Sequence, residues 1–570
     1  MEITFIKITN YRNLNGLEVA INKDINFIVG ENNIGKSNFQ NCLTKILSCK
    51  SFQKEDFTDD KESLSVDMTF HLNDEEIGIF DDLVDPTNRE IINIVAIQEN
   101  PDEYIRYYHK ETGETIPNSL IKKVNVISYD SLRNPKNEID FSKTKGAGAF
   151  LNFVVKRYIE DYAGTGILKK SEVRKVEKYI SKSLGNLNAF SRFGIKPHVD
   201  VDDADILSRV LLLKDQNDIS IPENGYGVQY NLLIMLSLLE KIIDFRKRAK
   251  DTDTDTEFSA LLIFDEPEIH LHPYLQRTLI RDIYRLALGQ DVQFNDLLNE
   301  YFGITQIHAQ IIITTHSPNI LGDDYTKIIR MFNRGDFTAA VSCSNLIFDY
   351  KEQKQLLMQF EYIKEAVFAR AAIIVEGESE YGSFKMFADT LGVDFDQEGI
   401  ALIKAGGAES ILPIIKLFNK LAIKAVGVID NDKKIEKNLP DKEYLFYTKS
   451  KCFDSEIVKR VIYNKRYDIL EAILTEYDSQ GDNRCMQQKK INEVIKTFNY
   501  KRINANKNYR FKDVDTTNPL YEVMYVSWFS INKGILLGKT IGRHLDKKNI
   551  PVCYVKAIKK VKEYADESRK

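Results

Sequence analysis

Residues 30–37 read GENNIGKS and match the phosphate-binding pattern G-x-x-x-x-G-K-[S/T] in full. They follow an apolar run at 25–29 that predicts a strand. They precede a segment whose apolar side chains recur at helical spacing, namely Phe39, Cys42, Leu43 and Ile46. Strand, glycine-rich turn and helix in this order are the context that the pattern requires. The sequence therefore predicts a site that binds the phosphates of a nucleotide at the start of a helix.

Each polar residue of this loop has an expected task. Lys36 reaches the β- and γ-phosphates, and the hydroxyl of Ser37 is a ligand of Mg²⁺. The glycines allow backbone N–H groups to approach the phosphates closely. The predicted ATP-binding residues of the loop are Gly30, Asn33, Gly35, Lys36 and Ser37.

A second apolar strand, at 260–264, ends in an acidic pair within LLIFDEPEIHLHP. We expect Asp265 to hold Mg²⁺ through water and Glu266 to activate the attacking water. The next apolar strand, at 309–314, leads into TTHSP, which predicts that His316 senses the γ-phosphate. Gln98 follows a strand at 91–97, and a nucleotide-contacting glutamine and a plain polar strand end explain it equally well.

A second group of carboxylates follows residue 370. AAIIVEGESE predicts a strand that ends at Glu376 with Glu380 at the start of a helix, and AVGVIDND predicts a strand that ends at Asp430 and Asp432. In a parallel sheet both strand ends can lie on one edge, where α/β active sites collect. Clustered carboxylates without histidine suit Mg²⁺ or Mn²⁺, and two such ions can clamp the oxygens of a phosphodiester.

Together these motifs resemble the OLD (overcoming lysogenization defect) family. The first three strand ends are similar to those of ABC-type ATPases of the SMC/RecF/OLD group, and the E-G and D-x-D strand ends resemble a Toprim domain. The resemblance implies an α/β fold in which an ABC/SMC-type P-loop ATPase domain with a helical insertion precedes a Toprim α/β domain. It also implies that two protomers sandwich ATP, and residues 224–229, NGYGVQ, resemble a degenerate signature motif.

The resemblance implies further site residues. An acidic pair like that of Gabija nucleases falls on Asp454 and Glu456 in FDSEIV, and the lysine near the C-terminus falls on Lys533, with Lys539 as second choice. The implied catalytic residues are Glu376, Glu380, Asp430, Asp432, Lys533 and, for ATP, Glu266. The implied metal ligands are Glu376, Glu380, Asp430, Asp432, Asp454, Glu456 and Ser37.

Changes in pattern along the chain predict four segments and a domain boundary near residues 345–370. Besides the strands named above, short strands are predicted at 3–8, 65–72 and 124–128, and one helix is predicted between the strands at 260–264 and 309–314. The ATPase domain is expected at 1–145 and 216–360, divided by a helical insertion at 146–215 that we expect to mediate dimerisation. A Toprim domain with a C-terminal extension is expected at 365–570. Residues 480–515 mix Lys and Arg with Phe and Tyr, which suits contact with DNA, although a solvated helix and loop explain this composition as well.

Composition excludes some classes of protein. The 570 residues carry a net charge of −5, so a general basic coat is absent. None of the six cysteines forms a CxxC pair, which argues against a zinc site and a disulfide framework. The first residues lack the layout of a signal peptide and no apolar run is long enough for a membrane span, so we expect a cytoplasmic protein without membrane contact.

The motifs and the resemblance favour one function. It is a nucleotide-regulated, divalent-metal-dependent DNA endonuclease that uses ATP and Mg²⁺ or Mn²⁺ and serves in antiphage defence. The implied partners are DNA, a second copy in a homodimer or higher homo-oligomer, and a helicase-like protein. The main alternative is a DNA-binding ABC-type ATPase scaffold or signalling module with an inactive Toprim domain. A strand-passing topoisomerase would need a tyrosine nucleophile, and no motif singles one out.

Overall fold

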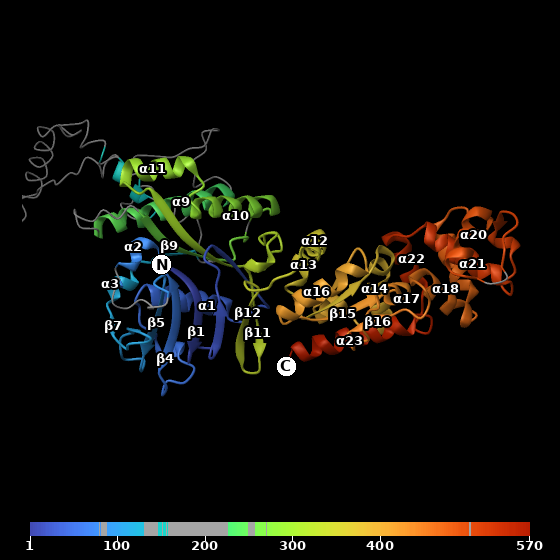
Figure 1. Cartoon of the computed structure of the whole chain (residues 1–570), viewed down its shortest axis with the longest axis horizontal. Coiled ribbons are helices and arrows are strands. Elements are labelled where there is room, and N and C mark those ends of the chain that lie inside the picture. The colour runs from blue at the N-terminus through green and yellow to red at the C-terminus, as the bar shows by residue number, and fades with distance from the viewer. Residues whose placement is uncertain are drawn as a thin grey trace, which may run out of the picture.

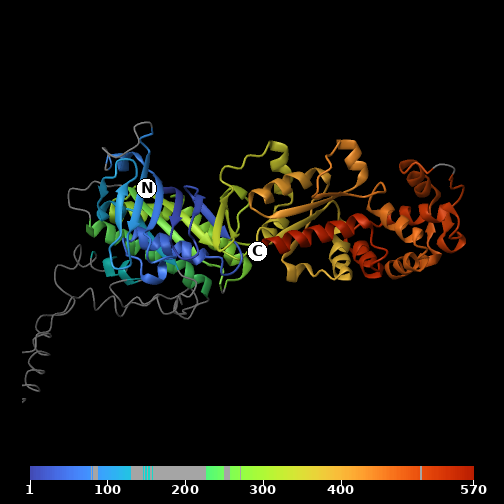
Figure 2. The same cartoon turned by 90° about the horizontal axis from the view of Figure 1, so that it is seen from below.

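The computed structural model has an elongated shape, with the N-terminal part at one end and the C-terminal helices at the other (Figures 1 and 2). The C-terminus returns to the junction between the two parts. In the described residues no helix is both long and apolar enough to cross a lipid bilayer. The structure describes residues 1–78, 80, 88–129, 146, 148–150, 152–154, 157, 226–248, 257–269, 271–500 and 503–569.

One sheet of the N-terminal part is antiparallel and has six described strands in the order β2-β1-β4-β5-β6-β7. Alternate residues of β4 and β5 are buried, as expected for strands with one face in the core. The strands predicted at 3–8, 65–72 and 91–97 are present as β1, β4 and β5. The bounds are β1 Glu2–Thr9, β2 Leu17–Ala20, β4 Leu64–His71, β5 Ile91–Gln98, β6 Arg106–His109 and β7 Thr115–Ile116.

The other sheet of this part carries the motif-bearing strands in the order β12-β11-β3-β10-β9-β8. Its strands pair in parallel except β11 with β12. All five residues of β3 are buried, because helices cover one face of the sheet and the antiparallel sheet with the helix after the phosphate loop covers the other. The strands predicted at 25–29, 124–128, 260–264 and 309–314 are present. The bounds are β3 Ile25–Val29, β8 Asn125–Tyr129, β9 Glu257–Asp265, β10 Gln306–Thr314, β11 Ile328–Arg334 and β12 Phe337–Ser342.

The helix predicted after the phosphate loop is present as α1, whereas the short helices α2 and α3 were not predicted. The sequence predicts one helix between the strands β9 and β10, and the structure has two. Gly289 adopts φ 62° after the first, and the carboxylate of Asp291 accepts a hydrogen bond from the Phe294 N–H at 3.0 Å to start the second. The bounds are α1 Lys36–Leu47, α2 Asp74–Ile77, α3 Asn118–Ile121, α9 Tyr226–Arg248, α10 Pro273–Ala287 and α11 Val292–Phe302.

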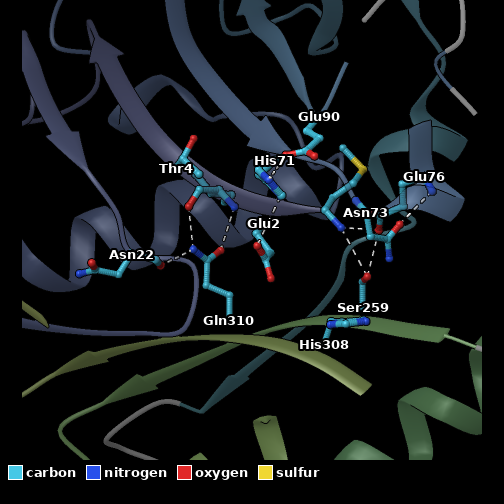
Figure 3. A network of polar contacts seen from close by, with 12 residues as sticks. Glu2, Thr4, Asn22, His71, Asn73, Glu76, Glu90, Ser259, His308 and Gln310 are labelled. Atoms are coloured by element: carbon cyan, nitrogen blue, oxygen red, sulfur yellow. Dashed lines mark hydrogen bonds and ion pairs between the residues drawn. The ribbon is translucent and has the colours of Figure 1, made fainter. Parts of the chain in front are cut away.

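Side-chain hydrogen bonds join the two sheets (Figure 3). The buried amide of Gln310 on β10 accepts from the backbone N–H of Ile3 at 3.0 Å and donates to its carbonyl at 2.6 Å. The same amide donates to the carbonyl of Asn22 at 2.7 Å. Farther along, the hydroxyl of Ser259 on β9 donates to Glu76 on α2 at 2.9 Å. These contacts fix β1 over the parallel sheet and thereby hold the turn that follows β1.

The C-terminal part is built on a parallel sheet in the order β14-β13-β15-β16. Ala372 and Ile374 of β13 join the core shared with the N-terminal part, and Ala371, Ile373 and Val375 join a second core on the other face. The bounds are β13 Ala371–Val375, β14 Ile400–Lys404, β15 Lys424–Ile429, β16 Leu445–Tyr447, α14 Glu378–Leu391, α15 Phe395–Glu398, α16 Ala408–Lys420, α17 Asn431–Lys437 and α23 Val552–Ser568.

Further helices extend this part away from the junction (Figure 1). The segment FDSEIV, which carries Asp454 and Glu456, begins α18. Within residues 480–515, α20 lies between β17 and β18, which pair as a small antiparallel sheet. The bounds are α18 Phe453–Tyr463, α19 Tyr467–Tyr477, α20 Gln488–Thr497, α21 Pro519–Ile531, α22 Ile535–His544, β17 Cys485–Met486 and β18 Tyr509–Arg510.

The boundary expected near residues 345–370 is occupied by two helices, α12 (Tyr350–Met358) and α13 (Phe360–Ala366). Next to them, the buried guanidinium of Arg330 on β11 donates to the carbonyls of Leu421 and Ala422 at 3.2 and 3.3 Å. It also donates to the carbonyl of Ala369 at 3.0 Å. The two parts therefore share a packed, hydrogen-bonded junction. Most of the expected helical insertion at 146–215 lies outside the described residues.

Candidate functional site

The loop after β3 has the backbone that phosphate binding needs. Gly30 has φ 154°, and a Cβ there would lie 2.5 Å from the carbonyl oxygen of Met331. Gly35, the residue before α1, has φ 102°, and a Cβ there would lie 2.6 Å from the amide nitrogen of Asn13. Asn33 also takes a left-handed conformation, at φ 61°. A side chain at either glycine would push the loop out of this shape.

Asn13 clamps the phosphate loop from the turn after β1. Its amide donates to the carbonyl of Ile34 at 3.0 Å and to the hydroxyl of Thr338 at 2.9 Å. Its oxygen accepts from the amide of Asn38 at 2.8 Å. Asn13 was not predicted, and no local pattern marks it, because its partners lie in the phosphate loop, on β12 and on α1.

Lys36 and Ser37 lie where the sequence predicts. The buried ammonium of Lys36 donates to the carbonyls of Gly30 and Glu31 at 3.1 and 2.8 Å. Burial lowers the pKa of Lys36 to about 8, against the opposing effect of Glu266 and other nearby carboxylates. The hydroxyl of Ser37 donates to Asp265 at 3.2 Å. Asp265, at the end of β9, therefore lies beside both the hydroxyl and the ammonium of the phosphate loop.

Strand register brings the second half of the nucleotide site to this loop. Thr314 pairs with Ile28 on one side and with Asp265 on the other, so three parallel strands end together. Glu266 takes a left-handed conformation at φ 48°, and its carboxylate lies 3.5 Å from Nε2 of His316. Burial, with Asp265 and Glu268 nearby, raises the pKa of Glu266, which favours a carboxyl that takes up a proton.

His316 is held by a residue that the sequence analysis did not single out. The carboxylate of Glu268 accepts from the His316 N–H at 2.7 Å and from the hydroxyl of Thr315 at 2.8 Å. Burial and the charge of Lys36 lower the pKa of His316, so its ring is neutral at pH 7. Glu268 belongs to the DEPE motif, and its spacing from Asp265 is the signal that could have pointed to it.

Two further nucleotide-site predictions stay untested. Gln98 is fully buried; its oxygen accepts from the Phe52 N–H at 2.7 Å, and its nitrogen donates to the Phe52 carbonyl at 2.9 Å. These contacts give its amide a structural task, and its role toward nucleotide stays a prediction. Of the signature-like motif, residues 224 and 225 lie outside the described residues, and the rest opens α9.

In the C-terminal part, strand ends meet as expected. Val375 pairs with Val428, so Glu376 and Asp430 follow the ends of two neighbouring parallel strands and lie side by side. The carboxylate of Glu376 accepts from the Asp430 N–H at 3.2 Å. With Asp432 and Lys533, these carboxylates line one cleft of about 630 Å³. Four of the predicted residues are thus brought together from three separate segments of the chain.

Two more predicted carboxylates, Glu380 and Asp454, are buried beside this group. Burial raises the pKa of Glu380 to about 7, and Asp454 and Glu376 add to the effect against a backbone hydrogen bond. Burial also raises the pKa of Asp430 well above its usual range, and Glu380, Glu376 and Asp432 add to it. The carboxylates are therefore close enough to disfavour one another's charge.

Lys533 supplies the nearest cation. Its ammonium lies 3.1 Å from Asp454, and the hydroxyl of Ser530 donates to the same carboxylate at 3.2 Å. Desolvation by itself would lower the pKa of Lys533, but the surrounding acidic groups, Asp454 foremost, together raise this pKa above its ordinary value, so the ammonium stays charged at neutral pH. Lys539, the second choice from the sequence, lines a different cleft beside Tyr381. Ser530 is a further residue that the sequence analysis missed.

The donor set fits a hard divalent cation. Oδ1 of Asp432 and Oδ1 of Asp454 are buried and have no hydrogen-bond partner in the described part of the chain, although each could bind a cation. In the same residues, no three acidic, His or Cys side chains are already gathered around a single ion position. Glu456 is turned toward a loop, where it accepts from the Ser450 N–H at 2.6 Å.

Comparisons with known proteins agree with this geometry. Residues 1–149 and 166–321 match the family described as the AAA ATPase domain. Residues 367–432 match the family described as the overcoming lysogenization defect protein-like TOPRIM domain. The first match covers more than half of the chain and contains the phosphate loop and Asp265; the second contains Glu376 and Asp430.

Similar proteins are distant in sequence. The OLD nuclease of Thermus scotoductus is 21% identical over 468 residues, which cover 75% of this chain and 81% of that protein. Endonuclease GajA of Bacillus cereus strain HuB5-5 is 22% identical over 62% of this chain and 54% of its own length. Endonuclease GajA of Bacillus cereus strain VD045 is 22% identical over 77% of this chain and 76% of its own length.

Among solved structures, an SMC head bound to the C-terminal winged-helix domain of ScpA aligns with 61% of this chain and 100% of its own, at 13% identity and a TM-score of 0.35. The family matches and the two motif-bearing sheets are the basis of the assignment. The chain belongs to the OLD family, in which an AAA-type P-loop ATPase domain precedes a Toprim domain, and it is a distant homologue of OLD nuclease and of the Gabija endonuclease GajA.

Proposed function

We propose that this protein is a divalent-metal-dependent DNA endonuclease whose cutting is controlled by ATP. The observation that carries the proposal is the convergence of Glu376, Asp430, Asp432 and Lys533 on one cleft. Acidic oxygens beside a permanently charged amine suit the hydrolysis of a phosphodiester, in which negative charge builds up at the phosphate. The likeness to OLD nuclease and to endonuclease GajA supports the same reaction class.

The residues of the cleft would divide the work. Glu376, Glu380, Asp430, Asp432 and Asp454 would hold Mg²⁺ or Mn²⁺, which when bound would activate water and stabilise the leaving oxygen. Lys533 would stabilise charge on the scissile phosphate, and Asp454 with Ser530 would orient its ammonium. Glu456 is the weakest member of the proposed ligand set, because its carboxylate already accepts a backbone N–H.

The nucleotide site would regulate this reaction. Lys36 would exchange its two carbonyl contacts for the β- and γ-phosphates, and Ser37 with Asp265 would hold the nucleotide's Mg²⁺. Glu266 would activate the water that attacks ATP, and His316 would report the γ-phosphate. Two protomers would close on ATP as a homodimer or a larger homo-oligomer. The family resemblance extends the proposal to antiphage defence beside a helicase-like partner.

A plasmid assay tests the proposal. Purified protein is incubated with supercoiled plasmid in Mg²⁺, in Mn²⁺ and in EDTA, each with and without ATP. The Asp430→Asn variant and the exposed-carboxylate control Asp441→Asn are run alongside. Nicking or linearisation that needs metal, is lost in Asp430→Asn and persists in Asp441→Asn supports the endonuclease. Absence of cutting under every condition, with ATP still bound, would favour an ATPase scaffold with an inactive Toprim domain.

A further inference from the structure

The loop between β16 and α18 is fixed to the turn that carries Asp430 and Asp432. The carbonyl of Lys451 accepts from the Asp432 N–H at 3.2 Å. The hydroxyl of Thr448 accepts from the Asn431 N–H at 2.9 Å. Ser450, between them, donates its N–H to Glu456. The backbone of Lys451 is therefore hydrogen-bonded to the acidic turn, and its side chain starts from a defined position.

The side chain of Lys451 extends to the opposite wall of the same cleft. Its ammonium donates to the carbonyl of Thr497, at the end of α20, at 2.7 Å. It also lies 5.4 Å from the centre of the Phe498 ring. A helix C-terminus and the face of an aromatic ring both attract a cation. These contacts leave the amine at the lining of the cleft.

Charge pairing distinguishes Lys451 from the other lysines of the cleft. Lys433 pairs with Glu436, Lys490 with Glu493 and Lys533 with Asp454, at 2.7, 3.1 and 3.1 Å. Among the described residues, no carboxylate lies within ion-pair distance of Lys451. Its charge is therefore the one in the lining that is not already neutralised by an acid, and it is available to an anion that enters the cleft.

We propose that Lys451 binds a backbone phosphate of the DNA strand that is being cut, next to the scissile phosphate, while the ring of Phe498 contacts the adjoining sugar or base. This inference rests on the proposed endonuclease function and names residues of its substrate site. Lys533, from the turn between α21 and α22, faces the carboxylates, whereas Lys451 lies on the wall formed with α20. The two lysines thus hold successive positions along one strand. A lysine on a ring is a common way to combine phosphate contact with stacking.

The test separates binding from cutting. DNA affinity is measured in the Asp430→Asn background, in EDTA, with a fluorescein-labelled duplex over a series of NaCl concentrations. Lys451→Ala, Lys451→Gln and Lys451→Arg are compared with Lys449→Ala, an exposed lysine of the same loop that is not part of the lining. Loss of one phosphate contact lowers the slope of log affinity against log salt by about 1, equally for unrelated sequences.

The expected result is a smaller slope for Lys451→Ala and Lys451→Gln, and an unchanged slope for Lys451→Arg and Lys449→Ala. Phe498→Leu weakens binding and keeps the slope, because it removes the ring and no charge. An unchanged slope in Lys451→Ala and Lys451→Gln, with both proteins folded by circular dichroism, overturns the inference. An equally large decrease of the slope in Lys449→Ala also overturns it. If the unsubstituted enzyme cuts plasmid while these slopes stay the same, only this inference fails; if it never cuts, the proposed function fails first.

Discussion

The guanidinium of Arg370 holds the carboxylate of Glu31 through two hydrogen bonds, from Nε to Oε1 at 2.8 Å and from Nη2 to Oε2 at 3.0 Å. Glu31 is the second residue of the phosphate loop, and Arg370 directly precedes β13, the strand that ends at Glu376. The hydrogen bonds from Arg370 lower the pKa of Glu31. A single ion pair thus connects the loop that binds nucleotide to the strand that carries the acidic cleft.

Replacing Arg370 by Gln tests this connection. The pair is partly exposed, so unfolding free energy should change by less than about 1 kcal/mol. Glu31 would then carry an uncompensated charge beside the phosphates, and ATP affinity measured by calorimetry should fall. Adding Glu31→Gln should restore much of it. In the plasmid assay the effect of ATP on cutting should shrink. Equal ATP affinities in the single and double variants would contradict the connection.

Lys36→Ala should abolish nucleotide control without harming the acidic cleft. The ammonium makes charge-assisted hydrogen bonds to phosphate, each worth about 2 kcal/mol, so ATP affinity should fall roughly 30-fold or more. Lys50→Ala, an exposed lysine just beyond α1, is the matched control. Calorimetry measures the affinity, and the plasmid assay without ATP checks the cleft. ATP binding at normal strength in Lys36→Ala would mean that the phosphate loop has been misassigned.

Glu380→Gln should stabilise the metal-free protein in a pH-dependent way. In the folded protein the pKa of Glu380 is raised from 4.5 to about 7. Below pH 4.5 the carboxyl is therefore protonated in both the folded and the unfolded protein, and it does not lower the free energy of unfolding. Between pH 4.5 and 7 the carboxyl ionises more readily in the unfolded protein, so the free energy of unfolding falls as the pH rises. Above pH 7 this loss of stability is complete, on the order of 3 kcal/mol. Glutamine cannot ionise and avoids the penalty.

Urea unfolding in EDTA at several pH values measures this difference. The advantage of Glu380→Gln over the unsubstituted protein should be near zero at pH 4.5 and largest at pH 7 and above. Glu476→Gln is a control, because this exposed carboxylate is paired with Arg543 and has a lowered pKa. A difference that stays constant across the pH range would show that Glu380 ionises normally in the fold.

Gly538→Ala should loosen the packing that places Lys533. Gly538 lies on α22 against α14, and a Cβ there would be 2.1 Å from the carbonyl oxygen of Ser379. Overpacking at such a contact costs about 1–3 kcal/mol, and cutting should fall because α22 begins two residues after Lys533. Leu536→Ala, exposed on the same helix, should change unfolding free energy by less than about 0.5 kcal/mol. Equal stability of the two variants would contradict this.

The sequence by itself determined the elements that carry the chemistry. The phosphate loop, the strand ending at Asp265 and the strands ending at Glu376 and Asp430 are where local patterns predict them. The reason is that the periodicity of strands and helices depends on residues that are close in sequence. In addition, the C-terminal ends of parallel strands lie at one edge of the sheet. The extra helix boundary at Gly289 was missed, because a single glycine gives a weak signal within an apolar pattern.

Only the tertiary structure decided which distant side chains meet. In the folded protein Lys533, and not Lys539, lies beside Asp454. Glu456 contacts Ser450, and Asn13 contacts the phosphate loop. The tertiary structure also joined Glu31 to Arg370, 339 residues apart. Such pairs depend on how whole helices and sheets pack, because this packing brings the two side chains within hydrogen-bond distance. No period or spacing along the chain carries that information, since it arises from the packing of distant elements in the hydrophobic cores.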